Sequence, residues 1–333
     1  MNNSQGYPAR FYQVEEGKEV RCLLCPHNCQ LTPGALGRCR TRKNIAGKLN
    51  SLNYGEVSSI SLDPIEKKPL YHFHPEARTL SVGTWGCNLS CGFCQNWRIS
   101  QDSPQVRELS PQEVVELCQN RGVEILAFTY SEPLIWYEFV SETAELAQAE
   151  KIATVLVSNG FVNPEPLAEL IPKISACNID LKSFRDEFYR KFCQGELAPV
   201  KKNLEYIAAS STHLEVTNLL ISGKNTSQSE IEELVKFLAD LEPEIPLHIS
   251  RYHPAYKFKE PATDIEDLLR AYALAKEHLS YVYLGNVPGN DKSNTSCPNC
   301  GSQVIIREGF SAHNYLQKNR CPECRHVIAG IFN

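Results

Sequence analysis

The stretch TWGCNLSCGFCQNW, residues 84–97, places three cysteines at a C-x3-C-x2-C spacing and supplies no fourth. It follows RTLSVGT, residues 78–84, a short run typical of a buried β-strand. Thiolates this closely spaced indicate a metal centre, yet structural zinc sites and most iron–sulfur clusters take four protein ligands. The sequence therefore predicts a centre at Cys87, Cys91 and Cys94, called the triplet below, with one coordination position open to an outside ligand.

Two histidines offer the alternative, a site closed by the protein. His72 and His74 stand in YHFHP, a few residues upstream of the strand. Histidine is a common metal ligand, but it is also a frequent packing and hydrogen-bonding residue. We favour the open site and keep the closed one as the alternative.

Downstream of this stretch, apolar runs alternate with segments of helical periodicity. Six further runs read as strands: residues 124–130, 153–159, 176–182, 214–221, 246–252 and 281–286. Regular alternation of strands and helices indicates parallel strands joined by right-handed crossovers. Six to seven units are fewer than the eight of a closed barrel. We therefore predict an α/β fold with a partial (β/α)6-type parallel barrel, and a flat doubly wound sheet is the alternative.

Two helix starts carry capping signals. Ser110, a proline after it and Glu113 form a capping box, and Gly122 marks the end of that helix. Thr263 and Glu266 have the same spacing before a second apolar-periodic segment. The sequence predicts an N-cap at both positions.

Composition limits the class of protein. The chain has 333 residues, 42% of them hydrophobic, which is enough for a folded core. It contains no apolar run of membrane-spanning length, and its first residues lack the plan of a secretory signal. The net charge of −5 argues against nucleic acid or an anionic membrane as partner. We expect a soluble, cytoplasmic protein.

Fourteen cysteines are many for such a chain, and most fall into groups. The C-terminal group has the C-x2-C-x20-C-x2-C spacing of a zinc ribbon and consists of Cys297, Cys300, Cys321 and Cys324. For this group we predict zinc, with a rubredoxin-like iron site as the alternative. Three isolated cysteines, Cys118, Cys177 and Cys193, are expected to be inert and buried.

The N-terminal group has a C-x2-C-x3-C-x9-C spacing that fits no common zinc pattern, and it consists of Cys22, Cys25, Cys29 and Cys39. We predict a metal site there and leave its identity open between a second iron–sulfur cluster and structural zinc. His27 could replace one of the cysteines. The groups divide the chain into a cysteine-rich extension at 1–60, a barrel at 61–290 and a ribbon-like domain at 291–333.

The triplet, with Phe93 directly before its last cysteine, resembles the signature of the radical SAM superfamily. Together with DPIEKKPLYHFHP at 63–75 it is similar to the radical SAM proteins of the AmmeMemoRadiSam system, relatives of pyruvate formate-lyase activating enzyme. The resemblance covers nearly the whole chain.

The resemblance implies a [4Fe-4S] cluster on the triplet whose open iron binds S-adenosylmethionine (SAM). Reductive cleavage of SAM then gives a 5'-deoxyadenosyl radical that abstracts hydrogen from a substrate. The cluster and SAM supply this radical chemistry, and the protein binds and orients them. It also implies an oxidoreductase or activase, an electron donor such as flavodoxin or ferredoxin, and a protein as candidate substrate.

The resemblance further implies a set of SAM contacts at strand ends. TYSEP at 129–133 keeps the Glu-Pro of the family's Gly-Gly-Glu-Pro motif and lacks both glycines. The implied contacts are Ser131, Glu132, Ser158, Asn159, Asp180, Lys182 and His253. Strand-end hydrogen bonds or surface ion pairs are the alternative roles for these side chains.

Two other functions are consistent with the residues alone. One is an iron–sulfur electron carrier or metal-bearing scaffold without SAM chemistry. The other is an RNA-modifying radical enzyme that docks through its C-terminal ribbon.

Overall fold

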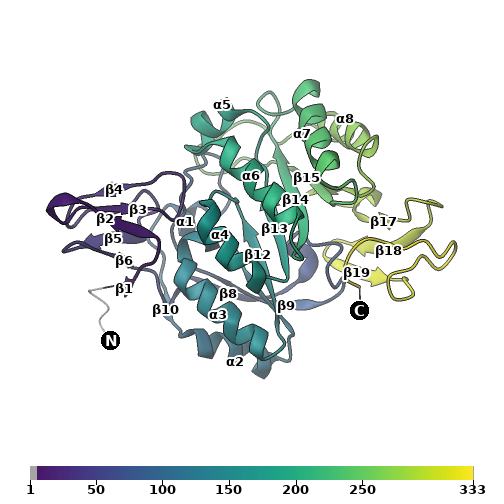
Figure 1. Cartoon of the computed structure of the whole chain (residues 1–333). Coiled ribbons are helices and arrows are strands. Elements are labelled where there is room, and N and C mark those ends of the chain that lie inside the picture. Colours follow the sequence, from purple (N-terminus) through teal and green to yellow (C-terminus); the bar gives the residue numbers. More distant parts are fainter. Residues whose placement is uncertain (1–5, 333) are drawn as a thin grey trace.

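The structure, a computed structural model, describes residues 6–332 and is built around an eight-stranded sheet (Figure 1). The strand order is β16-β15-β14-β13-β12-β11-β9-β8. The strands are β8 (Ser59–Pro64), β9 (Arg78–Gly83), β11 (Ile125–Phe128), β12 (Ala153–Ser158), β13 (Ala176–Asp180), β14 (His213–Leu220), β15 (Leu247–Arg251) and β16 (Val282–Gly285). All neighbours are parallel except β8, which runs antiparallel to β9. Because β8 and β16 do not pair, the sheet is an open, partial barrel, and the predicted fold and all seven predicted strands are confirmed.

Helices cover the outer face of this sheet (Figure 1). They are α2 (Pro111–Arg121), α3 (Tyr137–Ala149), α4 (Pro164–Leu170), α6 (Leu197–Ala208), α7 (Gln228–Leu241) and α8 (Ile265–Lys276), with short α1 (Trp97–Ser100) and α5 (Asp186–Phe188). Short 3-10 turns lie at Glu16–Lys18, Ile65–Lys67, Pro133–Trp136, Ile171–Lys173 and Asp291–Ser293, and a π-helical turn at Tyr189–Cys193. The strands are apolar and largely buried, as expected for parallel strands covered on both faces.

One of the two predicted caps is present. Ser110 and Glu113 form a complete capping box, and Gly122 ends α2 in the left-handed conformation at φ 61°. The prediction for Thr263 is wrong, because Asp264 is the N-cap of α8. The Thr263 side chain is fully buried and instead bonds the Leu220 carbonyl and the Tyr252 amide, so tertiary contacts override the local signal.

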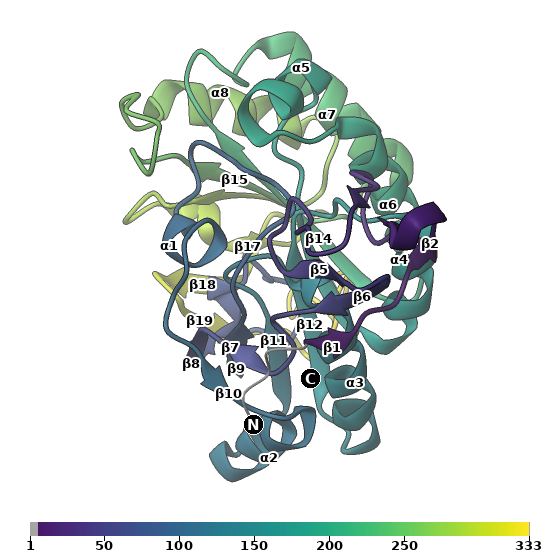
Figure 2. The same ribbon diagram turned by 90° about the vertical axis from the view of Figure 1, so that its left-hand side faces the viewer.

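The N-terminal strands form two small sheets near the carboxyl ends of the barrel strands. One sheet has the order β1 (Tyr7–Pro8), β6 (Lys48–Ser51), β5 (Arg42–Ile45), and the other β2 (Tyr12–Val14), β3 (Val20–Cys22), β4 (Gln30–Leu31). β7 (Glu56–Val57) pairs with β10 (Arg107–Glu108). Figure 2, which views the molecule from this side, shows β5, β6 and α1 in front of the central sheet. A buried ion pair of 2.7 Å joins Arg42 to Glu138 at the start of α3 and fixes these sheets to the barrel.

The C-terminal residues pack against the opposite end of the barrel. Their sheet contains β17 (Thr295–Ser296), β18 (Gln303–Glu308) and β19 (Ser311–Asn314). Tyr281, just before β16, and Tyr71, upstream of β9, share one apolar cluster with Val304 and Ile305. The Arg307 guanidinium lies 4.0 Å from the Tyr71 ring centroid and donates to the Tyr71 carbonyl. The ribbon therefore sits on the amino ends of the strands, at the right of Figure 1.

None of the helices formed by residues 6–332 is both long enough and apolar enough to pass through a membrane.

Candidate functional site

The triplet lies on the loop that joins β9 to α1, at the carboxyl end of the sheet, where α/β folds place ligands. Each outer thiol receives hydrogen bonds from its surroundings. The Leu89 amide lies 3.3 Å from the Cys87 sulfur, and the Asn159 Nδ2 lies 3.6 Å from it. The Ser100 hydroxyl is 3.3 Å from the Cys94 sulfur. Three cysteines, two of which have hydrogen-bonding partners at their sulfur atoms, suit an iron–sulfur cluster, whose potential depends on such bonds.

Neither histidine of YHFHP can serve as the fourth ligand. His72 is fully buried at the amino end of the barrel, where its Nδ1 donates to the Ala329 carbonyl and its Nε2 accepts from the Tyr283 hydroxyl. His74 lines a separate cavity of about 500 Å³ together with Arg78 and Glu124. Both precede β9, whereas the triplet follows it, so the length of the strand separates them. The closed alternative is wrong.

A cavity of about 280 Å³ faces the triplet and is walled by the carboxyl ends of six strands. Six of the seven predicted contacts line it: Ser131, Glu132, Ser158, Asn159, Asp180 and Lys182. His253 does not, because it lies two residues beyond the end of β15 and is exposed. Ser250 and Asn286 line the cavity there instead. The sequence signal that could have found Asn286 is an asparagine directly behind a strand, where it adopts φ 59°.

The comparisons with known proteins agree with this geometry. Residues 82–238 match the Radical SAM superfamily. The uncharacterized protein MJ0808 of Methanocaldococcus jannaschii is 40% identical over 329 residues, which cover 96% of this chain and 98% of that protein. The chain belongs to the radical SAM superfamily. GTP 3',8-cyclase of Limosilactobacillus fermentum is 28% identical over 163 residues, 46% of this chain and 48% of that enzyme.

The fold comparison concerns the barrel. SuiB of Streptococcus suis, in a structure bound to S-adenosylmethionine, aligns with a TM-score of 0.51 at 14% identity and covers 67% of this chain and 53% of that one. At this identity the similarity shows the shared fold and no more. The radical SAM superfamily implies a [4Fe-4S] cluster and SAM, and the triplet with its open side fits that cluster.

Glu132 is held by its own neighbours. Its Oε1 accepts from the Leu134 amide at 2.9 Å and the Ser158 hydroxyl at 2.7 Å, and its Oε2 accepts from the Asn159 amide at 2.9 Å. Burial raises the pKa of Glu132 to about 7 although these three donors act in the opposite direction. This radical SAM protein therefore uses Glu132 to tie the end of β11 to the end of β12.

Tyr130 stands where the family motif has its first glycine. It adopts φ 74°, a left-handed conformation that a bulky residue reaches only at a cost of about 1–3 kcal/mol. Bonds at both ends hold it, because its hydroxyl donates to Asp63 at 2.6 Å and its carbonyl accepts from Asn96 at 2.7 Å. The backbone thus takes the shape that glycine would allow, without glycine.

Lys182 and Asp180 form an ion pair of 2.9 Å beside the triplet. Burial alone would lower the pKa of Lys182, but Asp180 and the nearby Cys91 and Cys193 outweigh it and raise that pKa. Cys193, predicted to be inert, is buried beside Cys91. Cys118 and Cys177 are buried in the core, as predicted.

The loop behind β15 closes over the triplet. The amides of Lys257 and Phe258 donate to the Gly92 carbonyl at 2.9 and 3.2 Å. A Cβ at Gly92 would lie 2.6 Å from the Phe258 ring, so glycine is required at this close approach. The loop therefore packs on the segment between Cys91 and Cys94.

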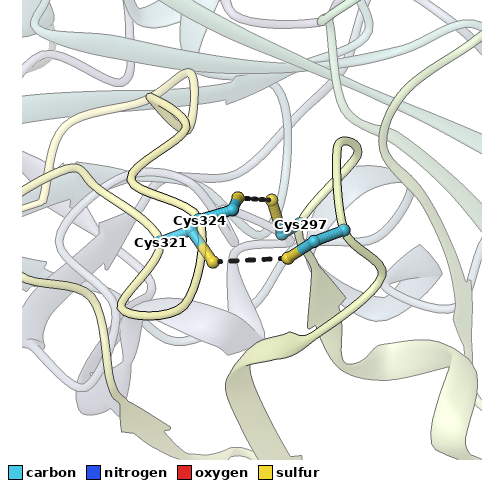
Figure 3. A group of neighbouring side chains, drawn as sticks. Cys297, Cys321 and Cys324 are labelled. Carbon is cyan, nitrogen blue, oxygen red and sulfur yellow. Dashed lines mark hydrogen bonds between the residues drawn. The ribbon is translucent and has the colours of Figure 1, made fainter.

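The C-terminal group is compact. Its four sulfur atoms all lie within 4.8 Å of one another, with Cys297 and Cys324 at 3.5 Å and Cys300 and Cys321 at 3.7 Å. Figure 3 shows Cys297, Cys321 and Cys324 pointing toward one another. Sulfurs around one tetrahedral zinc with bonds of about 2.3 Å would lie about 3.8 Å apart. The group has the size for a single metal ion.

The N-terminal group is more buried than the C-terminal group. Cys22, Cys25 and Cys39 are buried and Cys29 is partly exposed. Burial raises the pKa of Cys25, and the neighbouring Cys39, Cys22 and Cys29 raise it further. His27 is directed elsewhere, because its Nε2 donates to the Asn88 carbonyl at 2.7 Å.

Proposed function

We propose that this radical SAM protein binds a [4Fe-4S] cluster on Cys87, Cys91 and Cys94, binds SAM in the adjacent cavity, and acts on a protein in an activase-like role. The observation that carries the proposal is a three-thiolate site whose open side faces a cavity lined by six strand ends. When bound, the reduced cluster supplies one electron that cleaves SAM to methionine and a 5'-deoxyadenosyl radical, which abstracts hydrogen from the substrate.

In this proposal, the chain's own residues bind SAM and orient it. Asp180 and Lys182 present an opposed pair of charges, which complement the ammonium and carboxylate groups of an amino acid. Asn159 borders both the cavity and the Cys87 sulfur. Both oxygens of Glu132 accept hydrogen bonds from the chain, so Glu132 acts as a positioning residue for Ser158 and Asn159.

The size of the cavity supports a macromolecular substrate. Its volume of about 280 Å³ is below the roughly 300–1,000 Å³ of ordinary small-molecule pockets. A SAM molecule would occupy most of a cavity of this volume. A substrate must present its reactive group at the mouth, as a segment of a protein can.

The test is an anaerobic assay of 5'-deoxyadenosine formation with dithionite as reductant. We expect slow formation from SAM alone and faster formation with a dialysed cell extract. Stimulation by the small-molecule filtrate instead would refute the protein substrate. Stimulation that disappears after ribonuclease treatment would favour the RNA-modifying alternative, and complete absence of 5'-deoxyadenosine would leave the electron-carrier alternative.

A further inference from the structure

The N-terminal group forms one folded unit around its four thiols. Cys22 ends β3, and its amide donates to the Cys29 carbonyl at 2.9 Å, which brings the two ends of the loop together. The Asn28 amide donates to the Cys25 carbonyl at 3.0 Å and closes the turn between them. From the other side, the Thr41 hydroxyl lies 3.3 Å from the Cys39 sulfur. The loop is thus built to present thiols to a common ligand.

The spacing of these thiols differs from that of a single-ion site. Among residues 6–332, the C-terminal group is the one whose ligand atoms all lie within 4.8 Å, and neither the N-terminal group nor the triplet meets that limit. A single tetrahedral ion needs sulfurs about 3.8 Å apart. A cluster binds each thiolate through a different iron, so its sulfurs lie farther apart. Like the triplet, the N-terminal group therefore lacks the close spacing of a single-ion site.

The N-terminal group also lies directly against the triplet loop. A Cβ at Gly86 would lie 2.7 Å from the Cys39 carbonyl oxygen and 2.6 Å from the Thr41 methyl carbon. Standard bond lengths then place the Cα atoms of Cys39 and Cys87 within about 10 Å of each other.

A second contact joins the two loops. His27, between Cys25 and Cys29, donates to the carbonyl of Asn88, the residue after Cys87. The Asn88 side-chain Nδ2 in turn donates to the Phe161 carbonyl at 2.6 Å. Two contacts therefore join the N-terminal group to the triplet loop. They are the packing of Cys39 and Thr41 on Gly86 and the hydrogen bond from His27 to Asn88.

We propose that Cys22, Cys25, Cys29 and Cys39 hold a [4Fe-4S] cluster that relays single electrons to the cluster on the triplet. A reduced one-electron carrier protein gives one electron to the N-terminal cluster at its partly exposed Cys29 side. That electron then passes to the triplet cluster, so the first cluster returns to its oxidised state as the second becomes reduced. The relay, but not the presence of the N-terminal cluster, rests on the proposed SAM cleavage.

The first experiment measures metal content after anaerobic reconstitution. A variant with Cys87, Cys91 and Cys94 all changed to Ala should keep about four irons per chain and, when reduced, an electron paramagnetic resonance signal that SAM does not alter. Changing Cys22, Cys25, Cys29 and Cys39 to Ala instead should remove that signal and leave one that SAM alters. An iron-free triplet variant, or zinc bound at the N-terminal group, would overturn the proposal.

The second experiment compares two reductants in the N-terminal variant. Dithionite is small and reaches the triplet directly, so SAM cleavage should stay within about twofold of the unaltered protein. With reduced flavodoxin as the carrier, the rate should fall at least tenfold. Equal rates with flavodoxin would refute the relay. If the unaltered protein cleaves no SAM, the proposed function fails, while the metal content of the triplet variant still decides whether the N-terminal cluster exists.

Discussion

Each end of the barrel carries a group of four cysteines, the C-terminal group at the amino end and the N-terminal group at the carboxyl end, and the difference between these groups separates two uses of the same ligand. At the amino end, four sulfurs converge within 4.8 Å and hold together a short stretch of strands. At the carboxyl end, the N-terminal group is more widely spaced and touches the loop of the triplet. Four cysteines therefore form a structural metal site at one end and, as we propose, a redox-active cluster site at the other.

Packing around each group follows the same division. The ribbon contacts the barrel through Tyr71, Tyr281 and Tyr283, which bury apolar surface far from the cavity. The N-terminal group contacts it through Gly86 and His27, which border the triplet. Contacts at the amino end should therefore control stability, and contacts at the carboxyl end should control chemistry.

The largest effect is expected at the triplet itself. Cys91→Ala removes one of the three thiolates, so SAM cleavage should fall below detection, at least about a thousandfold. Cys193→Ser is the matched control, because Cys193 lies beside Cys91 without being a predicted ligand. It should keep the SAM-responsive cluster, as checked by iron content and 5'-deoxyadenosine release. Loss of the cluster in Cys193→Ser would make Cys193 the fourth ligand and close the site to SAM.

A second test targets the contact between Cys39 and Gly86. Gly86→Ala places a Cβ against the Cys39 carbonyl at φ 88°, so the free energy of unfolding should fall by about 3 kcal/mol or more. Gly122→Ala is the control, since Gly122 also has a positive φ, 61°, but no atom within 4 Å of the added Cβ. The control should cost about 1 kcal/mol in urea unfolding. Equal losses in both variants would show that the contact with Cys39 contributes nothing.

The sequence predicted the barrel well because its signals are local. Each parallel strand is buried on both faces and reads as an unbroken apolar run, as Ile125–Phe128 does. The capping box at Ser110 needs only residues within one turn. Features that depend on contacts with distant residues could not be predicted from a local pattern. At Thr263, the hydroxyl bonds the Leu220 carbonyl instead of capping α8.

The site was predicted in part for the same reason. Strand ends place Asp180 and Lys182 at the cavity because chain direction alone decides which end of a parallel strand they occupy. The same rule, applied to YHFHP, would have placed His72 and His74 at the opposite end. Two features depend on three-dimensional contacts that no local pattern encodes. They are the left-handed Tyr130, held by Asp63 and Asn96, and the packing of Cys39 on Gly86.

A third test applies to the amino end. Cys321→Ala removes a fully buried ligand of the C-terminal group, so about one metal ion per chain should be lost and the thermal midpoint should fall by about 10 °C. SAM cleavage per folded molecule should change less than twofold. Thermal unfolding, metal analysis and the dithionite assay check these outcomes. Parallel loss of activity and metal would contradict a purely structural ribbon.

The smallest expected effect is a pH dependence at the same end. Burial lowers the pKa of His72 to about 3, so the folded protein keeps this ring neutral between the Ala329 carbonyl and the Tyr283 hydroxyl. The unfolded chain binds a proton below the ordinary pKa near 6.5, so His72 stabilises the fold above that pH and loses this contribution as pH falls toward 3. The resulting slope approaches about 1.4 kcal/mol per pH unit.

His72→Asn can isolate this slope. Its amide can still donate to the Ala329 carbonyl but cannot titrate, so the free energy of unfolding should depend less on pH between about 4 and 6.5 than in the unaltered protein. The variant also loses ring packing against Tyr281, which lowers its stability at every pH without changing the slope. His278→Asn, at an exposed position of the barrel, is the control and should keep the original slope. Because the triplet lies at the other end, SAM cleavage at neutral pH should be unchanged in both variants, and a loss confined to His72→Asn would mean that the two ends are coupled through the strands.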